Sequence, residues 1–530
     1  MTSKGKEHSS RSLEDLMPEP AVVVDHDAEK ATPPITEAEA QARERLAQLE
    51  RDYGATWSSP LDPSDPYNWP SRLKVSIGVI FSFGQLVTLM SASMIAASLG
   101  DICRDLRIEP SEGQIVFSTY FLGLAFGPFL VAAWAEMSGR KGVWLFANAW
   151  FILWNALCPV GRSKGLMIVG RLMTGLGASA GVTLTGPVMA DMYREADRGK
   201  SLAIASFLPY LGPALGPILG GLLTHSVDWP WVFWIMCIFD AAITVLGLVF
   251  IRESYTPVLL RRKAAAQRKL DRSTTTGAVV VVLSPRTWWS YWRDFSSKLG
   301  DNMARPVLLL VRRPIVQIIA LLLALNFGIY TFLLSTFATL YIDRYGQTES
   351  AASLHYIAIA VGSSLSSQVG GRVMDVIYRR LADRAPDKRG RPEFRVRWMA
   401  PGVVLLPVGL FWYGWSAERG VSWAVVDVGA AVFSLGCFIG GQSLLAYQLD
   451  EFAEFGASST AATKMLSYVL GFAFPVFAPQ LYEGLGYGWG NSLLGFVWIV
   501  VAFPLTGLLW VWGEKLRGLG REERVSADEQ

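Results

Sequence analysis

Residues 212–221 read Gly-Pro-Ala-Leu-Gly-Pro-Ile-Leu-Gly-Gly, inside an apolar stretch that we expect to cross a membrane as the fifth span, and the run closes on Gly221. Three of its glycines recur every four residues and therefore share one face of a helix: Gly212, Gly216 and Gly220. A face without side chains lets a second helix approach at backbone distance, as helices do in lipid. Two prolines, Pro213 and Pro217, bend such a helix, and a membrane bundle tolerates them better than a soluble fold does.

A second edge of small residues occurs later in the chain, at Gly362, Ser366 and Gly370. Its spacing is again four residues, so these residues also share one helix face. We predict that this edge faces the glycines of the fifth span, and that the two helices together form a hinge and seal. The alternative is that both edges serve ordinary tight packing.

The composition is that of a membrane protein. Of 530 residues, 51% are hydrophobic and only 18% are charged, whereas soluble domains carry about 25% charged residues. The net charge of +3 gives no reason to expect a nucleic-acid partner. The four cysteines have no C-x-x-C spacing and the four histidines are scattered, so we expect no metal, no cofactor and no enzymatic activity.

Twelve stretches have the roughly 20 apolar residues that a helix needs to cross about 30 Å of hydrocarbon. They fall into two groups of six: 75–99, 113–135, 142–160, 165–190, 201–224 and 231–251, then 314–341, 351–378, 399–416, 421–448, 457–482 and 489–512. We therefore predict an all-α membrane protein built from two pseudo-symmetric six-helix bundles. The predicted organisation is a polar N-terminal tail (1–72), a first bundle (73–252), a central loop (253–313), a second bundle (314–513) and a short C-terminal tail (514–530).

Basic residues gather in alternate loops. The segments 261–272 and 379–397 hold six and eight of them, and both lie on the side where the termini would lie. Because basic loops stay in the cytoplasm, we predict that both termini are cytoplasmic. The expected partners are a lipid bilayer, protons and a small-molecule substrate, and we expect a monomer.

Several motifs resemble those of one transporter family. The glycine–proline stretch resembles the antiporter motif of the major facilitator superfamily, in its twelve-span drug:proton branch. The segment 132–141 is similar to that family's loop motif, with Ala132 for a glycine and Glu136 for an aspartate. Segments 62–70, 170–175 and 253–260 resemble signatures of the fungal multidrug and polyamine exporters. The resemblance implies proton-coupled export of drugs, toxins or secondary metabolites by alternating access, across the plasma membrane or, as an alternative, the vacuolar membrane.

Four ionisable residues lie within predicted spans, where charges are costly and are candidates for function: Arg171, Asp240, Asp427 and Lys464. The family's cavity is lined by spans one, four, seven and ten, which favours Arg171 and Asp427 as a charged pair for proton coupling. For Arg171 the alternative is a role in fixing helix contacts. For Asp240 it is a local hydrogen bond to a neighbouring helix.

Two further sets of residues complete the predicted site. Polar side chains on cavity-lining spans are expected to contact substrate: Gln85, Asn326, Tyr330 and Gln442. The resemblance also implies an inner-surface clasp that holds the two halves together in one state: Glu136, Gly139, Arg140, Lys141 and Asp191. The alternative for the clasp residues is capping of helix ends at the membrane surface.

Other kinds of membrane protein fit the sequence less well. An ATP-driven pump needs a phosphate-binding loop, and the Gly-Lys-Ser at residues 199–201 has Arg194 where the first glycine of that loop should stand. The open alternatives are an exporter dedicated to one organic acid or metabolite, which the cations Arg171 and Lys464 would suit, and an uptake symporter.

Overall fold

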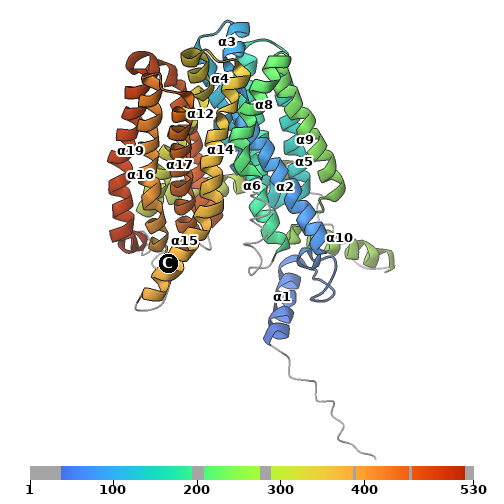
Figure 1. The fold of residues 1–530 in the computed structure, drawn as a ribbon. Coiled ribbons are helices and arrows are strands. Elements are labelled where there is room, and N and C mark those ends of the chain that lie inside the picture. Colours follow the sequence, from blue (N-terminus) through green and yellow to red (C-terminus); the bar gives the residue numbers. More distant parts are fainter. Residues whose placement is uncertain (1–36, 194–207, 275–287, 386–389, 453–455, 520–530) are drawn as a thin grey trace, which may run out of the picture.

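The computed structural model describes residues 37–193, 208–274, 288–385, 390–452 and 456–519. All of its regular elements are helices, arranged as two side-by-side bundles (Figure 1). Helices α1, α10 and α15 and the C-terminal end of α19 lie on one side of the molecule, which we call the terminal side. The short helix α3 lies on the other, which we call the opposite side.

The first bundle contains the following helices: α2 (Ser71–Ser93), α4 (Pro110–Ser138), α5 (Arg140–Leu157), α6 (Lys164–Met192), α8 (Gly212–Ser226) and α9 (Pro230–Phe250). On the opposite side, the 3₁₀ turn η2 (Met94–Ala96) and α3 (Leu99–Leu106) link α2 to α4. The first seven residues of the predicted fifth span, 201–207, lie outside the described residues. A further 3₁₀ turn, η4 (Pro209–Leu211), precedes α8.

The second bundle contains the following elements: α12 (Pro314–Tyr345), α13 (Glu349–Leu354), α14 (Tyr356–Leu365), η5 (Ser366–Gly370), α15 (Gly371–Arg384), α16 (Glu393–Glu418), α17 (Trp423–Glu451), α18 (Gly456–Val476) and α19 (Ala478–Gly518). The predicted eighth span is interrupted, because η5 is a π-helical turn between α14 and α15. The predicted eleventh span ends early, at Val476, and non-helical backbone at Gly486 divides α19.

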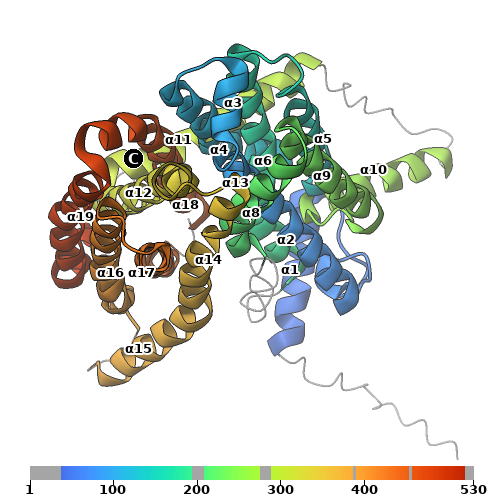
Figure 2. The ribbon, with the colours of Figure 1, turned by 45° about the horizontal axis from the view of Figure 1, so that its top comes forward.

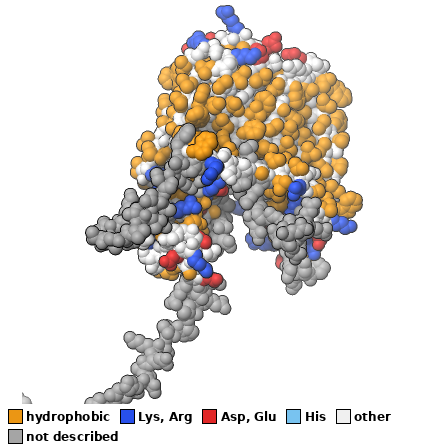
Figure 3. All heavy atoms as spheres, turned by 180° about the vertical axis from the view of Figure 1, so that it is seen from behind, with side chains coloured by type: hydrophobic (Ala, Val, Ile, Leu, Met, Phe, Trp, Pro, Cys, Tyr) orange, Lys and Arg blue, Asp and Glu red, His pale blue; other side chains and the backbone are white. Residues whose placement is uncertain are grey.

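Eight of the described helices are long and apolar enough to cross a membrane. They carry their apolar side chains outward as well as inward: Val249, Val500 and Val511 are 71%, 71% and 70% exposed. Figure 3 shows the resulting hydrophobic band around the molecule, with charged side chains above and below it. An apolar exterior of this kind is stable only in lipid, so the prediction of an all-α membrane fold is confirmed.

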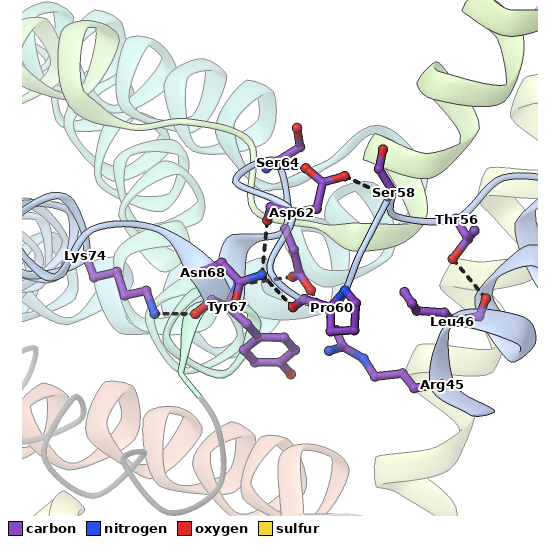
Figure 4. Close-up of polar contacts among 11 residues, drawn as sticks. Arg45, Leu46, Thr56, Ser58, Pro60, Asp62, Ser64, Tyr67, Asn68 and Lys74 are labelled. Carbon is purple, nitrogen blue, oxygen red and sulfur yellow. Dashed lines mark hydrogen bonds and ion pairs between the residues drawn. The ribbon is translucent and has the colours of Figure 1, made fainter. Parts of the chain in front are cut away.

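The chain before α2 forms a compact platform on the terminal side. Helix α1 (Glu37–Tyr53) leads into the 3₁₀ turn η1 (Pro66–Asn68), which Asp65 caps. The Asp62 carboxylate accepts hydrogen bonds from the backbone N–H groups of Ser58 and Ser64, both at 2.8 Å (Figure 4). The central loop joins this platform through α10 (Thr256–Thr274), where Lys263 donates to the Thr56 carbonyl oxygen at 2.9 Å. A second loop helix, α11 (Trp288–Arg312), leads into α12.

The two halves meet most closely on the opposite side and diverge toward the terminal side (Figures 1 and 2). Ala97 and Ala214, from the first half, are buried within the hydrophobic core of the second. At the level of the membrane the seam is aromatic: Phe121 of α4 packs against Phe327 of α12, with ring centroids 5.6 Å apart. This arrangement leaves the terminal side as the side toward which the seam opens.

Candidate functional site

Arg171 lies in the interior of the first half, in α6. Its guanidinium donates to the carbonyl oxygens of Ser91 in α2 and Phe117 in α4, at 3.0 and 3.4 Å, and lies 4.5 Å from the centre of the Tyr120 ring. The side chain is fully buried, and its Nε has no hydrogen-bond partner among the described residues. In this conformation Arg171 therefore ties three helices together and does not line an open cavity.

Asp427 lies near the start of α17, on the opposite side. Its Oδ1 accepts a hydrogen bond from the Tyr341 hydroxyl at 2.6 Å, and its Oδ2 lies 2.8 Å from Nδ1 of His355. The other ring nitrogen of His355 lies 2.9 Å from the Gln347 side-chain oxygen. The structure therefore does not bring Arg171 and Asp427 together as the predicted pair. Asp427 instead has a histidine partner within its own half.

Asp240 is a buried carboxyl group in α9, only 2% exposed. Its Oδ2 has no hydrogen-bond partner among the described residues, so the local hydrogen bond considered for it is not found at that atom. Asn155 of α5 donates to the Phe233 carbonyl oxygen at 2.8 Å and lies 3.4 Å from Sγ of Cys237, which precedes Asp240 by one turn of α9. An unsatisfied carboxylate oxygen at this depth is costly, which makes Asp240 a candidate for holding a proton.

Lys464 lies in α18, at the seam between the halves. It precedes Tyr468 by one helical turn, and the Tyr468 ring stacks at 6.5 Å on Phe121 and meets Phe327 edge-on at 5.4 Å. Lys464 is only partly buried, and no hydrogen bond or ion pair joins it to another residue in the described part of the chain. A partly buried cation one helical turn from an aromatic cluster is suited to bind an amphipathic molecule that carries negative charge.

Three of the predicted substrate-contacting residues lie in the second half, at two places, and the fourth lies in the first half. Asn326 and Tyr330 lie on one face of α12, toward α17: Asn326 donates to the Cys437 carbonyl oxygen at 3.2 Å, and the Tyr330 ring stacks on Phe433 at 6.5 Å. The Tyr330 hydroxyl is buried without a partner among the described residues. Gln442 bonds to Ser367 in the π-helical turn at 3.1 Å. Gln85 is in the other half, on α2.

The glycine edge of α8 packs against α2, so the prediction that it faces the small-residue edge of the eighth span is wrong. A β-carbon at Gly212 would lie 2.6 Å from the Leu89 β-carbon, and one at Gly220 would collide with the Met94 carbonyl oxygen. The other edge faces α17, where a β-carbon at Gly362 would lie 3.0 Å from Ser434. Periodicity identified both bare faces correctly but did not identify what covers each of them.

Helix α8 reaches the second half through a different face, at Gly221. A β-carbon there would lie 2.6 Å from the Ser353 hydroxyl oxygen and 2.9 Å from the Glu349 carbonyl oxygen, both in α13. Gly221 directly follows Gly220 and therefore points about 100° away from it around the helix. One short glycine-rich segment thus lets α8 approach both α2 and α13.

The predicted clasp residues lie on the terminal side, but their partners lie in the first half or, for Tyr255, just after it in the central loop. Arg140 Nε lies 3.3 Å from the Asp191 carboxylate at the end of α6, and the Arg140 guanidinium lies 4.2 Å from the centre of the Tyr255 ring. Lys141 donates to the Leu248 carbonyl oxygen at 3.0 Å. No hydrogen bond or ion pair joins Glu136 to another described residue. In this conformation the clasp caps helix ends and does not join the halves.

Glu253 completes the clasp, and sequence reasoning gave it no role. Its carboxylate accepts hydrogen bonds from the backbone N–H groups of Arg140 at 2.8 Å and Lys141 at 3.2 Å, the exposed donors at the start of α5. A β-carbon at Gly139 would collide with this carboxylate, and Gly139 has a φ of 102°. The glycine, the two basic residues and the acid therefore form one unit.

Comparisons with known proteins agree on the family. Residues 81–475 match the family model described as Major Facilitator Superfamily. The chain is 38% identical over 429 residues to a probable efflux pump of Aspergillus flavus, covering 80% of this chain and 99% of that protein. It is 33% identical over 463 residues to an efflux pump of Floropilus chiversii, covering 87% and 84% of the two chains. Among solved structures, a POT family transporter in complex with a thioalcohol-conjugated peptide has a TM-score of 0.60 at 16% identity, covering 85% and 97%.

Proposed function

Because the chain belongs to the major facilitator superfamily, and is therefore a multi-pass transporter of small molecules, we propose that it exports drugs, toxins or secondary metabolites from the cytoplasm in exchange for protons. The direction is supported by two relatives that are named efflux pumps. It is also supported by the glycine–proline stretch of α8, which resembles the antiporter motif. The proposed orientation has both termini in the cytoplasm, so that the terminal side is the inner side, and the proposed membrane is the plasma membrane.

The seam between α4, α12 and α18 is the observation that carries this proposal. Phe121 comes from the first half, whereas Phe327 and Tyr468 come from the second, and the three rings meet beside the partly accessible Lys464. A flexible contact of aromatic rings between two bodies accepts amphipathic molecules of varied shape. If the halves rock about the seam, the same rings are exposed to each side of the membrane in turn.

Proton coupling is proposed to involve two carboxyl groups, the partly buried Asp427 and the buried Asp240. Asp427 shares hydrogen bonds with His355 and Tyr341 near the outer end of its half, so a proton that arrives from outside changes the charge of this cluster. Asp240 has an oxygen without a hydrogen-bond partner among the described residues of the first half, and a bound proton would remove the cost of burying its negative charge. Arg171 is proposed as a positioning residue, because its donors hold α2 and α4 in place.

The test is transport by the purified protein in proteoliposomes under an imposed pH gradient, with cationic drugs and weak acids screened side by side. We expect movement of substrate against the proton flux and loss of that movement when an ionophore collapses the gradient. Transport that ignores the gradient would remove proton coupling from the proposal. Substrate and protons moving in the same direction would replace export by uptake.

A second candidate function is export of an organic acid, and Lys464 is the observation that favours it. A cation without an ion-pair partner among the described residues, next to the seam, attracts an anionic group. The same proteoliposome screen separates the two functions if it includes Lys464→Gln and Lys464→Arg. An anion exporter should lose transport in Lys464→Gln and keep most of it in Lys464→Arg. An exporter of cations should be unaffected or improved by Lys464→Gln.

A further inference from the structure

The two halves are joined on the opposite side by a small cluster of charged residues, apart from the groups invoked above for transport. Among the described residues, the ion pair that crosses between the halves is that of Arg104 in α3 with Glu349 in α13, at 3.4 Å. Arg104 also pairs with Asp101 on its own helix. Ser353, one turn further along α13, lies against Gly221 of α8. The cluster therefore lies beside the contact of α8 with α13, where helices of the two halves meet.

Two carboxyl groups face each other within this cluster. Glu349 and Asp101 both pair with the Arg104 guanidinium, so two carboxyl groups share one cation across the contact of α3 with α13. The side chains of Glu349 and Asp101 are 22% and 26% exposed, whereas that of Arg104 is 75% exposed. Two carboxyl groups held at one guanidinium can hydrogen-bond to each other only if one of them carries a proton. One mostly solvated guanidinium offsets only part of the charge of two carboxylates.

We propose that Asp101 and Glu349 form a proton-binding latch, in which a shared proton holds the two halves together on the opposite side and its loss drives them apart. With the proton bound, the Glu349 carboxyl donates to the Asp101 carboxylate, and Arg104 neutralises the remaining charge. Without the proton, two carboxylates repel each other across the contact between α3 and α13. The latch then favours separation of α13 from α3 and α8.

The titration of Glu349 lies in a range that a cell surface experiences. Burial, and then the neighbouring Asp101, raise the pKa of Glu349 to about 7. Because the folded-state pKa is raised, the closed contact is favoured below this pH and loses its stabilisation as the pH rises through it. Thr224 and Arg104 act in the other direction, since both stabilise the ionised carboxylate.

Other titratable groups near α13 bond elsewhere. His355, which follows α13, is held by Asp427 and Gln347, and Arg344 at the end of α12 donates to the Glu418 carbonyl oxygen at 2.6 Å. Asp343 lies on the same end of α12, and His225 follows Thr224 in the sequence. Histidine is the side chain whose charge ordinarily changes between about pH 5 and 8, so the experiment includes a variant in which both histidines are replaced.

The latch would make the proposed exchange cycle run outward, provided that the opposite side faces the outside of the cell, as in the proposed orientation. Acid outside the cell loads the latch after substrate has left, which closes the outer side and returns the transporter to the state that opens inward. The latch itself is independent of which substrate is carried. It is also independent of whether transport is coupled to protons at Asp427 or Asp240.

The experiment measures opening on the opposite side with a membrane-impermeant maleimide. In a variant without the four native cysteines, Ser353→Cys reports on the contact with α8, because Ser353 is fully buried in the closed state. Ala97→Cys, at 3% exposure in the core of the second half, is an independent second reporter. Val160→Cys, at 65% exposure on the same side, corrects for the pH dependence of thiol reactivity. Labelling is measured in detergent without substrate or gradient, so the result does not depend on transport.

We expect the corrected labelling of both reporters to rise by about tenfold between roughly pH 5.5 and 8.5, with a midpoint near 7. Glu349→Gln and Asp101→Asn should each remove this pH dependence and keep labelling low, because either change eliminates the repulsion between two carboxylates. A double control, His225→Gln with His355→Gln, should retain the dependence. Size-exclusion profiles identify variants that do not fold. If one of the two carboxyl variants, Glu349→Gln or Asp101→Asn, does not fold, the other tests the proposal.

The proposal is overturned if labelling of both reporters is independent of pH, or if the histidine control abolishes the dependence while Glu349→Gln keeps it. Failure of proton-driven transport in proteoliposomes with the labelling result intact would remove the proposed function and leave the latch. Proton-driven transport in proteoliposomes together with labelling that does not depend on pH would remove the latch and leave the proposed function.

Discussion

His355 and Asp427 form a partly buried contact between an imidazole and a carboxylate, with Nδ1 and Oδ2 2.8 Å apart. The Tyr341 ring stacks on the imidazole, with ring centroids 3.8 Å apart, and its hydroxyl donates to the same carboxylate. Because the carboxylate side chain is only 18% exposed, it depends on these two partners in place of water.

The first prediction concerns this contact. Asp427→Asn should lower the rate of gradient-driven efflux by about tenfold or more, because the amide cannot take up a proton and replaces the carboxylate that His355 and Tyr341 contact. A tenfold loss corresponds to about 1.4 kcal/mol. Tyr341→Phe is the matched control, since it removes one hydrogen bond to the carboxylate and leaves His355 in place, and we expect a smaller loss. Efflux that remains at the parental rate in Asp427→Asn would exclude this cluster from proton coupling.

The second prediction concerns the backbone at Gly139. Its φ of 102° lies in a region that glycine adopts readily and that other residues rarely adopt. A β-carbon at this position would also collide with the Glu253 carboxylate. Gly139→Ala should therefore destabilise the protein by about 1–3 kcal/mol, measured as a lower midpoint of thermal unfolding in detergent. Gly142→Ala, three residues away in α5, is the control, because nothing lies within 4 Å of its β-carbon position. An equal effect of the two substitutions would contradict the role assigned to Glu253.

The sequence predicts the fold because the membrane leaves few solutions. Only helices satisfy their own backbone hydrogen bonds in lipid, so counting apolar stretches was sufficient for the architecture. The partners of individual side chains follow from tertiary geometry instead. His355 and Asp427 are 72 residues apart, and Arg140 and Glu253 are 113 apart. Neither contact leaves a periodic signal, which is why His355 and Glu253 received no role from the sequence.

The glycine edges show that a periodic pattern identifies a helix face but not the helix that packs against it. Spacing of four residues establishes that Gly212, Gly216 and Gly220 share a face, but either of two neighbouring helices satisfies that pattern equally well. The structure places α2 there and leaves Gly221, on another face, to contact α13. The proposed roles of Lys464 and of the cavity residues on α12 and α17 stay predictions, because they depend on a substrate.

The third prediction concerns the contact of α8 with α2. A β-carbon at Gly220 would meet the Met94 carbonyl oxygen, which belongs to the backbone and has little freedom to move. Gly220→Ala should therefore cost about 1–3 kcal/mol of stability through overpacking and should reduce efflux, because α8 then no longer seats against α2. Gly186→Ala in α6 is the control, since its β-carbon would have no neighbour within 4 Å. Parental stability and efflux in Gly220→Ala would show that the bare edge is dispensable.

The fourth prediction concerns pH and the platform before α2. Burial by itself raises the pKa of Asp62, but the backbone N–H groups of Ser58 and Ser64 and the charge of Lys263 outweigh it and lower the pKa to about 2. Because the folded-state pKa is depressed, the stabilisation is present above the unfolded value of about 3.9 and is lost as the pH falls toward 2. A difference of nearly two units corresponds to about 2 kcal/mol.

Asp62→Asn should therefore loosen the platform near neutral pH, where the carboxylate is fully ionised, and should make little difference near pH 2. Hydrogen exchange of the backbone N–H groups of residues 58–68 measures this locally, and the Ser58 and Ser64 groups should exchange faster in the variant. Asp52→Asn, at an exposed position in α1, is the control and should leave exchange unchanged. Equal protection of Ser58 and Ser64 in parent and Asp62→Asn at neutral pH would mean that the carboxylate does not hold the segment. The bonds drawn in Figure 4 would then be incidental to its stability.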